Sequence, residues 1–459
     1  MKKLLATLLA SAMALTTVAG LTACGEDKPT LTVWAPAAAK KAYEARVADW
    51  KKDNEQYKDW TVKFENKAEG EAETDLGIDP TKGADIFFME AGQIATMESK
   101  AYLQKLTTEY SDLIKARDSE ATYKPVERDG RMLAFPCTSD NGYFLYYDKE
   151  FFDADDVKTL DGMLAKMEGK TVTVDGAETP VKIMFEYDNG YYEVSWFFGT
   201  GCMADWQDED QTIYKTDVST SEAGRAAARA SIKYLGGYKD NFQNGGTGAM
   251  LTGFANKSVV AAFSGTWGAQ GDDTGSLTDA LKKANRIGKD ENGEDEKYTK
   301  VIGATKLPTF KTTLDNGEEK EYQMGSFVGG KYCGINRYKN NVETITAAMS
   351  LANYFCDQAG QEARFDATEA GPSNLNVAAM QKVKDNVLVS ALNQQNAAGG
   401  YAQLSQNGLW DAMKAFGEGC WKGEITASNM QSKLNDLAKA MAKGASKLLG
   451  DNNVEISLS

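Results

Sequence analysis

Residues 31–64 read LTVWAPAAAKKAYEARVADWKKDNEQYKDWTVKF and establish the class of fold. Residues 31–34 alternate between apolar and polar side chains, which predicts a β-strand. Residues 39–57 place apolar side chains at helical spacing and predict an amphipathic helix. Residues 60–64 alternate again and predict a second strand. A strand, a helix and a strand within about thirty residues form a βαβ unit, with parallel strands and a right-handed crossover.

Predicted strands and helices continue through the rest of the chain. Residues 84–89 form an apolar run that suits a buried strand, and a predicted helix follows at 92–104. Residues 132–136 and 142–147 are predicted strands joined by a turn or a crossing. Further predictions are a strand at 259–263 and helices at 221–235, 342–357, 376–390 and 425–449. The expected fold class is α/β, and 459 residues exceed the size at which a single core usually divides.

Composition excludes several classes of function. The chain contains no histidine, which excludes Ser-His-Asp and Cys-His catalysis and zinc sites with histidine ligands. Its formal net charge of −15 makes nucleic acid a poor partner, because an acidic surface repels phosphate backbones. Nucleotide-binding glycine loops are absent, and the acidic segment 290–296 has Asp295 where a calcium loop needs glycine. We therefore expect neither a cofactor nor a metal ion.

The N-terminal segment is typical of an export signal. Lys2 and Lys3 precede an uncharged stretch, residues 4–23, and acidic residues follow it. The stretch is long enough to span a bilayer, so an uncleaved anchor helix is the alternative.

Residues 21–24, L-T-A-C, resemble the bacterial lipobox. That resemblance implies that residues 1–23 are a lipoprotein signal peptide and that lipid is attached to Cys24. Residues 24–30 would then be a tether, and the protein would be lipid-anchored to the outside of the cytoplasmic membrane.

The later cysteines leave their own chemistry open. No two of them form C-x-x-C, which excludes a zinc ribbon and a thioredoxin motif. They are either small buried hydrophobic residues or members of at most two disulfides, and the sequence does not select the pairs. These residues are Cys137, Cys202, Cys333, Cys356 and Cys420.

Aromatic side chains gather where an α/β fold usually binds its ligand. Residues 185–206 are rich in Phe, Tyr and Trp, Trp34 and Trp267 follow predicted strands, and Trp410 lies at a predicted helix start. Such rings stack on the apolar faces of sugars, and nearby carboxylates and amides bind hydroxyls. The sequence therefore predicts a carbohydrate site. Core packing is the alternative for any single ring, above all among residues 196–198.

Paired carboxylates would permit a different chemistry. Glu90 and Asp140 are candidates for the acid and the nucleophile of a glycoside hydrolase. The sequence does not fix the distance between them, so a lipid-anchored glycoside hydrolase remains the alternative function. A cell-surface adhesion module is a third class.

Several longer stretches, taken in chain order, carry a family resemblance. They are LTVWAPAAAKKAYEARVADW, ADIFFMEAGQIATMESKAYLQKLT, MLAFPCTSDNGYFLYYDKEFF, AMLTGFANKSVVAAFSGTWGAQ, IGATKLPTF and SFVGGKYCGINRYKNN. Together with the lipobox they resemble the extracellular solute-binding proteins of ABC sugar importers, specifically the maltose/maltodextrin-binding group. The resemblance implies a two-lobed periplasmic-binding-protein fold of type II with a hinge. It also implies a monomeric, non-catalytic receptor that binds an oligosaccharide and delivers it to ABC permease subunits.

The same resemblance implies domain boundaries. Residues 31–138 and 306–357 are assigned to an N-terminal lobe, and residues 139–305 and 358–459 to a C-terminal lobe. Closure over the ligand would occur at the crossings between the lobes.

The resemblance also implies which residues bind the ligand. Matched by position, they are Trp34, Asp140, Asn189, Tyr191, Trp267 and Trp410. The family's polar residues after the first strand are replaced by residues 35–37, and its Asp-Arg pair is replaced by Gly92 and Gln93. We expect Glu90 and Gln93 to take over that role, with a malto-oligosaccharide or a related sugar as the ligand.

Overall fold

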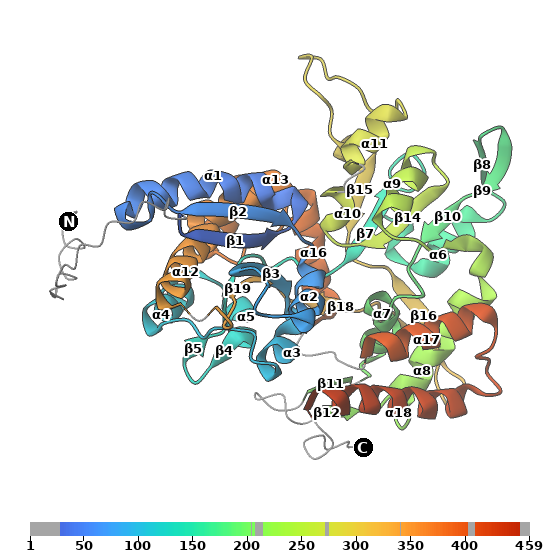
Figure 1. Ribbon diagram of the computed structural model, residues 1–459. Helices are drawn as coiled ribbons and strands as arrows, with labels where there is room; N and C mark the ends of the chain where they lie inside the picture. Colours follow the sequence, from blue (N-terminus) through green and yellow to red (C-terminus); the bar gives the residue numbers. More distant parts are fainter. Residues whose placement is uncertain are drawn as a thin grey trace, which may run out of the picture.

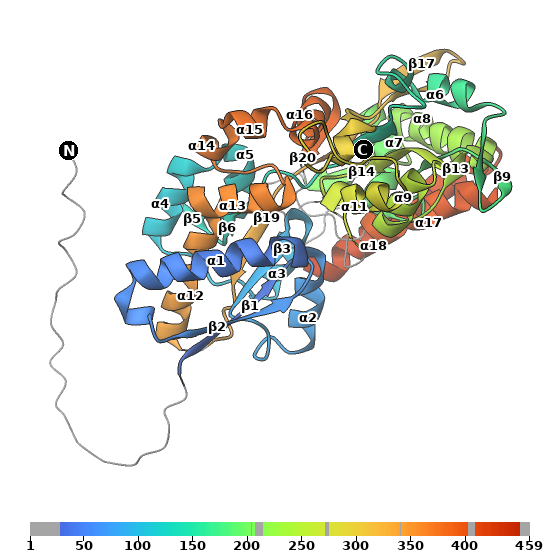
Figure 2. The same cartoon turned by 90° about the horizontal axis from the view of Figure 1, so that it is seen from above.

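The computed structural model describes residues 28–202, 204–206, 214–270, 275–339, 341–402 and 409–449. These residues form two α/β lobes that lie side by side, each built around its own five-stranded sheet (Figure 1). Figure 2 shows the same two bodies from above. The predicted α/β class is confirmed. The predicted signal peptide and Cys24 lie outside the described residues.

The first lobe contains a sheet with the strand order β2-β1-β3-β19-β6. β1 pairs in parallel with β2 and β3, which confirms the predicted βαβ unit, whereas β19 is antiparallel to β3 and β6. Helices α1, α12 and α13 pack against one another beside this sheet. The elements are β1 (Thr30–Ala35), α1 (Ala37–Asp53), β2 (Thr61–Asn66), β3 (Ile86–Glu90), β6 (Ala134–Pro136), β19 (Lys331–Ile335), α12 (Val342–Cys356) and α13 (Gln358–Thr368).

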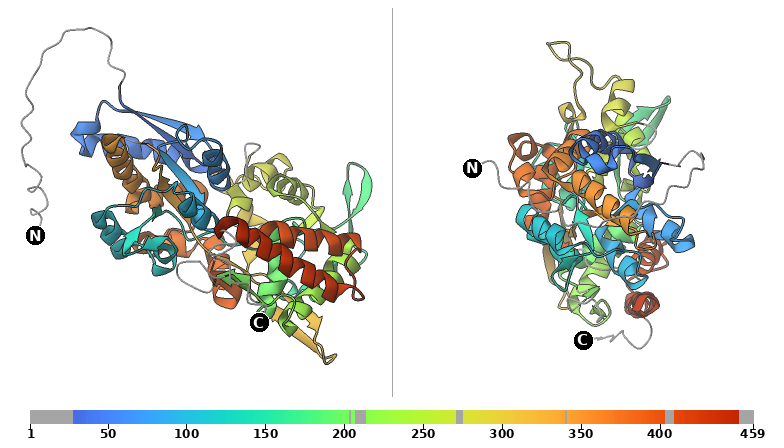
Figure 3. Two further views of the ribbon diagram at one scale, coloured as in Figure 1. Left: turned by 60° about the horizontal axis from the view of Figure 1, so that its bottom comes forward. Right: turned by 60° about the vertical axis from the view of Figure 1, so that its left-hand side comes forward.

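The second lobe contains a sheet with the strand order β13-β10-β14-β7-β15. Its strands are β7 (Phe144–Asp148), β10 (Lys182–Met184), β13 (Phe242–Gln243), β14 (Val259–Ser264) and β15 (Ile302–Thr305). Its main helices are α6 (Leu160–Met167), α7 (Gly190–Thr200), α8 (Glu222–Ser231), α9 (Thr247–Ala255), α16 (Val387–Gly399), α17 (Leu409–Lys422) and α18 (Met430–Leu449). The two red helices α17 and α18 run side by side on this lobe (Figure 3).

The remaining elements are short. The helices are α2 (Ala72–Ile78), α3 (Ile94–Ser99), α4 (Thr108–Arg117), α5 (Glu120–Tyr123), α10 (Trp267–Gln270), α11 (Leu277–Lys283), α14 (Leu375–Ala378) and α15 (Gln381–Lys384). The strands are β4 (Glu127–Arg128), β5 (Arg131–Met132), β8 (Thr171–Val174), β9 (Ala177–Pro180), β11 (Ala204–Trp206), β12 (Tyr214–Thr216), β16 (Thr309–Thr313), β17 (Glu319–Gln323), β18 (Ser326–Val328) and β20 (Gly400–Ala402).

Short 3-10 helical turns and one π-helix are the remaining described elements. The 3-10 turns are η1 (Glu55–Tyr57), η2 (Glu69–Glu71), η3 (Ala91–Gln93), η4 (Lys124–Val126), η5 (Asp156–Lys158), η7 (Lys239–Asn241) and η8 (Tyr298–Lys300), and η6 (Ile232–Gly237) is a π-helix.

Each lobe has its own hydrophobic core. Tyr43, Trp50 and Phe87 are fully buried in the first, and Trp196 and Tyr234 stack in the second with ring centroids 5.3 Å apart. Burying a large apolar side chain contributes roughly 1.5–3 kcal/mol, so the rings account for much of the stability of each lobe. Because the cores are separate, each lobe can move as a unit without disrupting the core of the other.

Three segments of chain connect the lobes. The first, residues 137–143, joins β6 to β7; the second, residues 329–330, joins β18 to β19; the third, residues 369–386, joins α13 to α16. The first is bonded to both others, because Asn141 N donates to the carbonyl oxygen of Gly329 at 3.1 Å and Ser139 N to that of Gly371 at 2.8 Å.

Two glycines allow the first and second segments to lie against each other. A Cβ on Gly142 would lie 2.2 Å from the carbonyl oxygen of Phe327, and one on Gly330 would lie 2.4 Å from that of Thr138. Any other side chain would push the two crossing segments apart.

The lobes are divided along the chain differently from the sequence-based boundaries. The hairpin of β16 and β17 packs in the second lobe, where the ring of Phe310 lies 5.2 Å from that of Trp196. Helix α13 packs in the first lobe, where Arg364 Nη1 donates to Tyr43 Oη at 2.7 Å. The boundary at 306 had assigned the hairpin to the first lobe, and the boundary at 358 had assigned α13 to the second lobe. Contacts over long sequence separations set these positions, and local patterns do not report them.

Candidate ligand-binding cleft

A cleft of about 610 Å³ lies between the two lobes. Its first wall comes from the end of β3 and the turns at η2 and η3 of the first lobe. Its second wall comes from the starts of α7, α9, α10 and α17 in the second lobe. Asn141 of the first crossing also lines it. Strand ends and helix starts thus supply the lining, as in other open α/β folds.

The start of α7 places two predicted residues in the second wall. Asn189 caps the helix, since its Oδ1 accepts from Tyr191 N at 3.1 Å. Its Nδ2 donates to Glu186 Oε2 at 3.1 Å. One amide therefore starts the helix that presents Tyr191 and also orients the carboxylate of Glu186 beside the cleft.

Tyr191 is the centre of an aromatic cluster. Its ring centroid lies 5.7 Å from that of Trp410 and 6.1 Å from that of Trp267, and all three side chains line the cleft. The fully buried Phe327 stacks on Tyr191 at 5.1 Å and supports it from behind. The hydroxyl of Tyr191 is buried and has no hydrogen-bond partner among the described residues.

A close approach of α17 to α7 brings Trp410 to this cluster. A Cβ on Gly190 would lie only 2.2 Å from the carbonyl oxygen of Trp410. Glycine at the first position of α7 therefore allows the two helix starts to touch, and the contact fixes Trp410 beside Tyr191.

Glu90 and Gln93 form the first wall. Glu90 is the last residue of β3, and its backbone N–H donates to Gln93 Oε1 at 3.1 Å. Gln93 Nε2 donates to the carbonyl oxygen of Gly70 at 2.9 Å, which ties η3 to η2. Burial raises the pKa of the Glu90 carboxyl, and Lys331 offsets part of that rise. Glu90 is thus a partly desolvated acceptor at the edge of the cleft.

Asp140 does not face the cleft. It is 0% exposed, its Oδ2 accepts from Thr266 Oγ1 at 2.6 Å, and Lys331 Nζ lies 3.5 Å from the same oxygen. Burial by itself raises the pKa of Asp140, but Lys331 and Arg364 outweigh it and hold the pKa below its ordinary value. Both contacts involve Oδ2, whereas Oδ1 is buried without a hydrogen-bond partner. Asp140 is not among the residues that line the cleft.

Trp34 does not line the cleft either. It is 8% exposed within the core of the first lobe, and its Nε1 donates to Glu65 Oε2 at 2.7 Å. β1 lies next to the edge strand β2, and Trp34 is in register with Glu65 on that strand. The ring therefore packs toward the outer edge of the sheet.

The structure adds cleft residues that the sequence did not single out, namely Glu73, Asn141, Glu186, Tyr192 and Thr247. Glu186 follows β10 by two residues, so the strand-end rule that selected Trp34 also applies to it. No local signal marks Glu73 or Thr247. Burial raises the pKa of the Glu73 and Glu186 carboxyls.

The charged side chains that line the cleft are all acidic. Glu73, Glu90 and Glu186 line it, and its described lining contains no Lys or Arg. Across the described part of the chain, no group of three or more cysteine or acidic side chains is arranged to hold a metal ion.

A sequence profile of the bacterial extracellular solute-binding proteins matches residues 37–391. The chain belongs to this family. No functionally curated protein matches it. Apart from the undescribed segments, no helix of this solute-binding protein has the length and apolar character needed to cross a membrane.

Solved structures resemble this solute-binding protein over most of its length. One solved with acarbose is 25% identical with a TM-score of 0.72, and the match covers 90% of this chain and 99% of that one. A maltodextrin-binding protein from L. casei, solved without ligand, is 21% identical with a TM-score of 0.69, covering 91% and 99%. MalX from Streptococcus pneumoniae, solved with maltopentaose, is 18% identical with a TM-score of 0.67, covering 90% and 99%. The predicted two-lobed binding-protein fold is confirmed.

Proposed function

We propose that this chain is the lipid-anchored substrate-binding protein of an ABC importer and that its ligand is a malto-oligosaccharide. The observation that carries the proposal is one cleft lined by Tyr191, Trp267 and Trp410 together with Glu90 and Glu186. Aromatic faces stack on sugar rings, and carboxylates bind their hydroxyls. A volume of about 610 Å³ suits a small ligand.

Relatives support the choice of ligand class. Among the similar structures, one was solved with acarbose, one with maltose and one with maltopentaose. Malto-oligosaccharides are therefore the first ligands to test.

The proposed ligand residues are Glu90, Gln93, Glu186, Asn189, Tyr191, Trp267 and Trp410. Trp34 and Asp140 are assigned supporting roles, since one lies in a core and the other neutralises Lys331 behind Trp267.

Hinge closure is the proposed mode of capture. Rotation about the three crossings brings the first wall onto a sugar already stacked on the rings of the second wall. The sugar shifts the equilibrium only because it makes better contacts in the closed form. The closed form then docks on a membrane permease, and lipid on Cys24 keeps the protein at the membrane.

The proposal includes no bond-breaking step. A glycoside hydrolase needs two carboxylates on either side of the scissile bond. Asp140, the candidate partner of Glu90, has no exposed surface, whereas Glu90 and Glu186 line the cleft from opposite lobes. Whether the sugar is cut is therefore decided by experiment. A labelled malto-oligosaccharide incubated with the protein is expected to return uncut on chromatography, and cleavage products would support the hydrolase instead.

Titration calorimetry tests the sugar proposal directly. Maltotriose and longer malto-oligosaccharides are expected to bind with micromolar or tighter affinity and to quench tryptophan fluorescence. Absence of heat with every member of a panel of gluco-, manno-, xylo- and galacto-oligosaccharides would contradict carbohydrate binding. Heat with another sugar but none with the malto series would reject only the malto assignment.

A further inference from the structure

Three cysteines meet inside the first lobe, at the base of the crossings. Cys137 follows β6 directly and begins the first crossing. Cys333 lies on β19, which follows the second crossing. Cys356 is the last residue of α12, next to α13, which leads into the third crossing. All three are 0% exposed.

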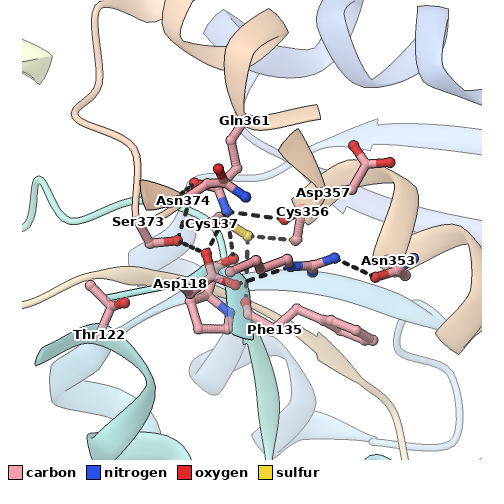
Figure 4. A network of polar contacts seen from close by, with 12 residues as sticks. Asp118, Thr122, Phe135, Cys137, Asn353, Cys356, Asp357, Gln361, Ser373 and Asn374 are labelled. Atoms are coloured by element: carbon pink, nitrogen blue, oxygen red, sulfur yellow. Dashed lines mark hydrogen bonds and ion pairs between the residues drawn. The ribbon is translucent and has the colours of Figure 1, made fainter. Parts of the chain in front are cut away.

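Cys356 interacts with both other thiols, and its contact with Cys137 is a close approach of the two sulfurs. The Sγ atoms of Cys137 and Cys356 lie 2.9 Å apart, although 219 residues separate them in sequence (Figure 4). A disulfide bond is about 2.05 Å long, so the two sulfurs lie within about 1 Å of bonding distance.

The backbones on both sides of this contact are already held together. Gln361 Nε2 donates to the carbonyl oxygen of Cys356 at 3.0 Å and to that of Pro136 at 3.3 Å. It also donates to Asp118 Oδ1 at 2.9 Å, and Figure 4 shows this amide above the pair of sulfurs. One side chain therefore keeps the end of α12 beside the start of the first crossing.

We propose that Cys137 and Cys356 form a disulfide in the folded protein. The family functions outside the cytoplasm, where disulfides form and persist. Cys333 stays a free thiol in this arrangement. The inference does not depend on which ligand the cleft binds.

The bond forms by exchange with a disulfide oxidant, such as a thiol oxidoreductase or oxidised glutathione. The first cysteine, as thiolate, attacks the oxidant's disulfide and releases one thiol of the oxidant. The second then attacks the sulfur of the first and releases the other thiol. The two cysteines lose two protons and two electrons, and the oxidant gains the two electrons as two thiols.

Burial determines when this exchange takes place. It raises the pKa of both thiols well above the ordinary value in the folded state, and the thiolate is the reactive form. The exchange therefore occurs while the first lobe is still folding. The finished bond would join the start of the first crossing to the end of α12 in the first lobe.

Peptide mapping tests the pairing. The full-length chain is unfolded, reduced, and refolded in a mixture of oxidised and reduced glutathione; free thiols are then alkylated in denaturant without reduction. We expect a peptide pair joined through Cys137 and Cys356, lighter by two hydrogen atoms than the reduced pair. Recovery of both cysteines in alkylated form, or a link that includes Cys333, would overturn the proposal.

Matched variants complete the experiment. Cys333→Ser is expected to keep the link, and Cys137→Ser is expected to lose it and to unfold at a lower temperature. Because the map of the wild-type chain decides the pairing, the test stands even where a variant folds poorly.

Discussion

Lys331 is a buried cation directly behind the cleft. Its ammonium lies 5.5 Å from the ring centroid of Trp267 and 3.5 Å from Asp140 Oδ2. A buried ammonium without a partner is strongly destabilising, so Asp140 is needed to hold Lys331 in place. The exposed lining keeps only the carboxylates of Glu73, Glu90 and Glu186. At the scale of residues, the ammonium of Lys331 lies against the ring of Trp267, and the carboxylates of the glutamates line the cleft. This arrangement favours uncharged sugars over anionic ones, because the carboxylates repel an anion.

Trp267→Ala tests the stacking role. We expect the affinity for maltotriose to fall by roughly 1–3 kcal/mol, since an aromatic contact of this kind is lost. Trp421→Ala is the matched control, because Trp421 stacks on Tyr187 at 4.1 Å and does not line the cleft. Calorimetry that gives both variants the wild-type affinity would remove Trp267 from the binding site.

At the scale of elements, helix α7 connects the cleft to the core of the second lobe. Its first turn carries Tyr191 at the cleft, and two residues later the fully buried Glu193 accepts a hydrogen bond from Ser231 on α8. Its first residue, Gly190, touches α17. The same helix therefore sets the position of a ligand-facing ring and depends on a buried carboxyl.

Gly190→Ala tests the contact between α7 and α17. The added methyl would displace the start of α17, so we expect a loss of about 1–3 kcal/mol of stability and a weaker affinity as Trp410 moves away. Gly288→Ala serves as the control, because Gly288 is exposed and its Cβ would meet no atom within 4 Å. Thermal unfolding and calorimetry on both variants measure the effect, and equal behaviour of the two would contradict it.

Glu193 gives the packing of α7 on α8 a pH dependence. Burial raises its pKa to about 8 from 4.5, although the hydrogen bond from Ser231 lowers it. Between these pH values the folded chain keeps a proton on Glu193 that the unfolded chain has lost. The contribution of Glu193 to the free energy of unfolding is therefore complete below pH 4.5 and declines as the pH rises toward 8. The slope is up to about 1.4 kcal/mol per pH unit.

Glu193→Gln is expected to remove this slope, because the amide still accepts from Ser231 but does not titrate. Urea unfolding at several pH values between 5 and 8 compares the two proteins. If the free energy of unfolding of the wild type changes with pH as that of the variant does, Glu193 ionises normally and the prediction is wrong.

The sequence predicts elements better than it predicts the directions of side chains. The unit of β1, α1 and β2 follows from local periodicity. Tyr191, Trp267 and Trp410, which the resemblance assigned to ligand binding, line the cleft. Strand alternation shows which residues share a face but not which face meets the cleft, so Trp34 was assigned to the site although it packs in the core. Asp140 is buried against Lys331, which lies 191 residues away, and no local pattern reports that contact.

At the scale of the whole molecule, three segments of the described chain cross between the lobes, and the third of them contains α14 and α15. Asn141 and Ser139 bond the first segment to the other two, and Gly142 and Gly330 let them lie close. Rotation of the lobes therefore concentrates in a few residues, while both cores stay intact.

Small-angle scattering tests this closure. We expect the radius of gyration to fall when maltotriose saturates the protein, because the cleft closes around it. Trp267→Ala is expected to need a higher sugar concentration for the same fall, in proportion to its weaker affinity. A radius that does not change at saturation would mean that the lobes bind sugar without moving.

β1 begins the described chain in the first lobe, and α18 ends it in the second. Lys28 and Lys439, near those two ends, are exposed. If a donor dye is attached to one and an acceptor dye to the other, the distance between the dyes would change when the lobes close on a sugar. The protein would then serve as an optical sensor that converts the sugar content of a sample into a ratio of two emission colours.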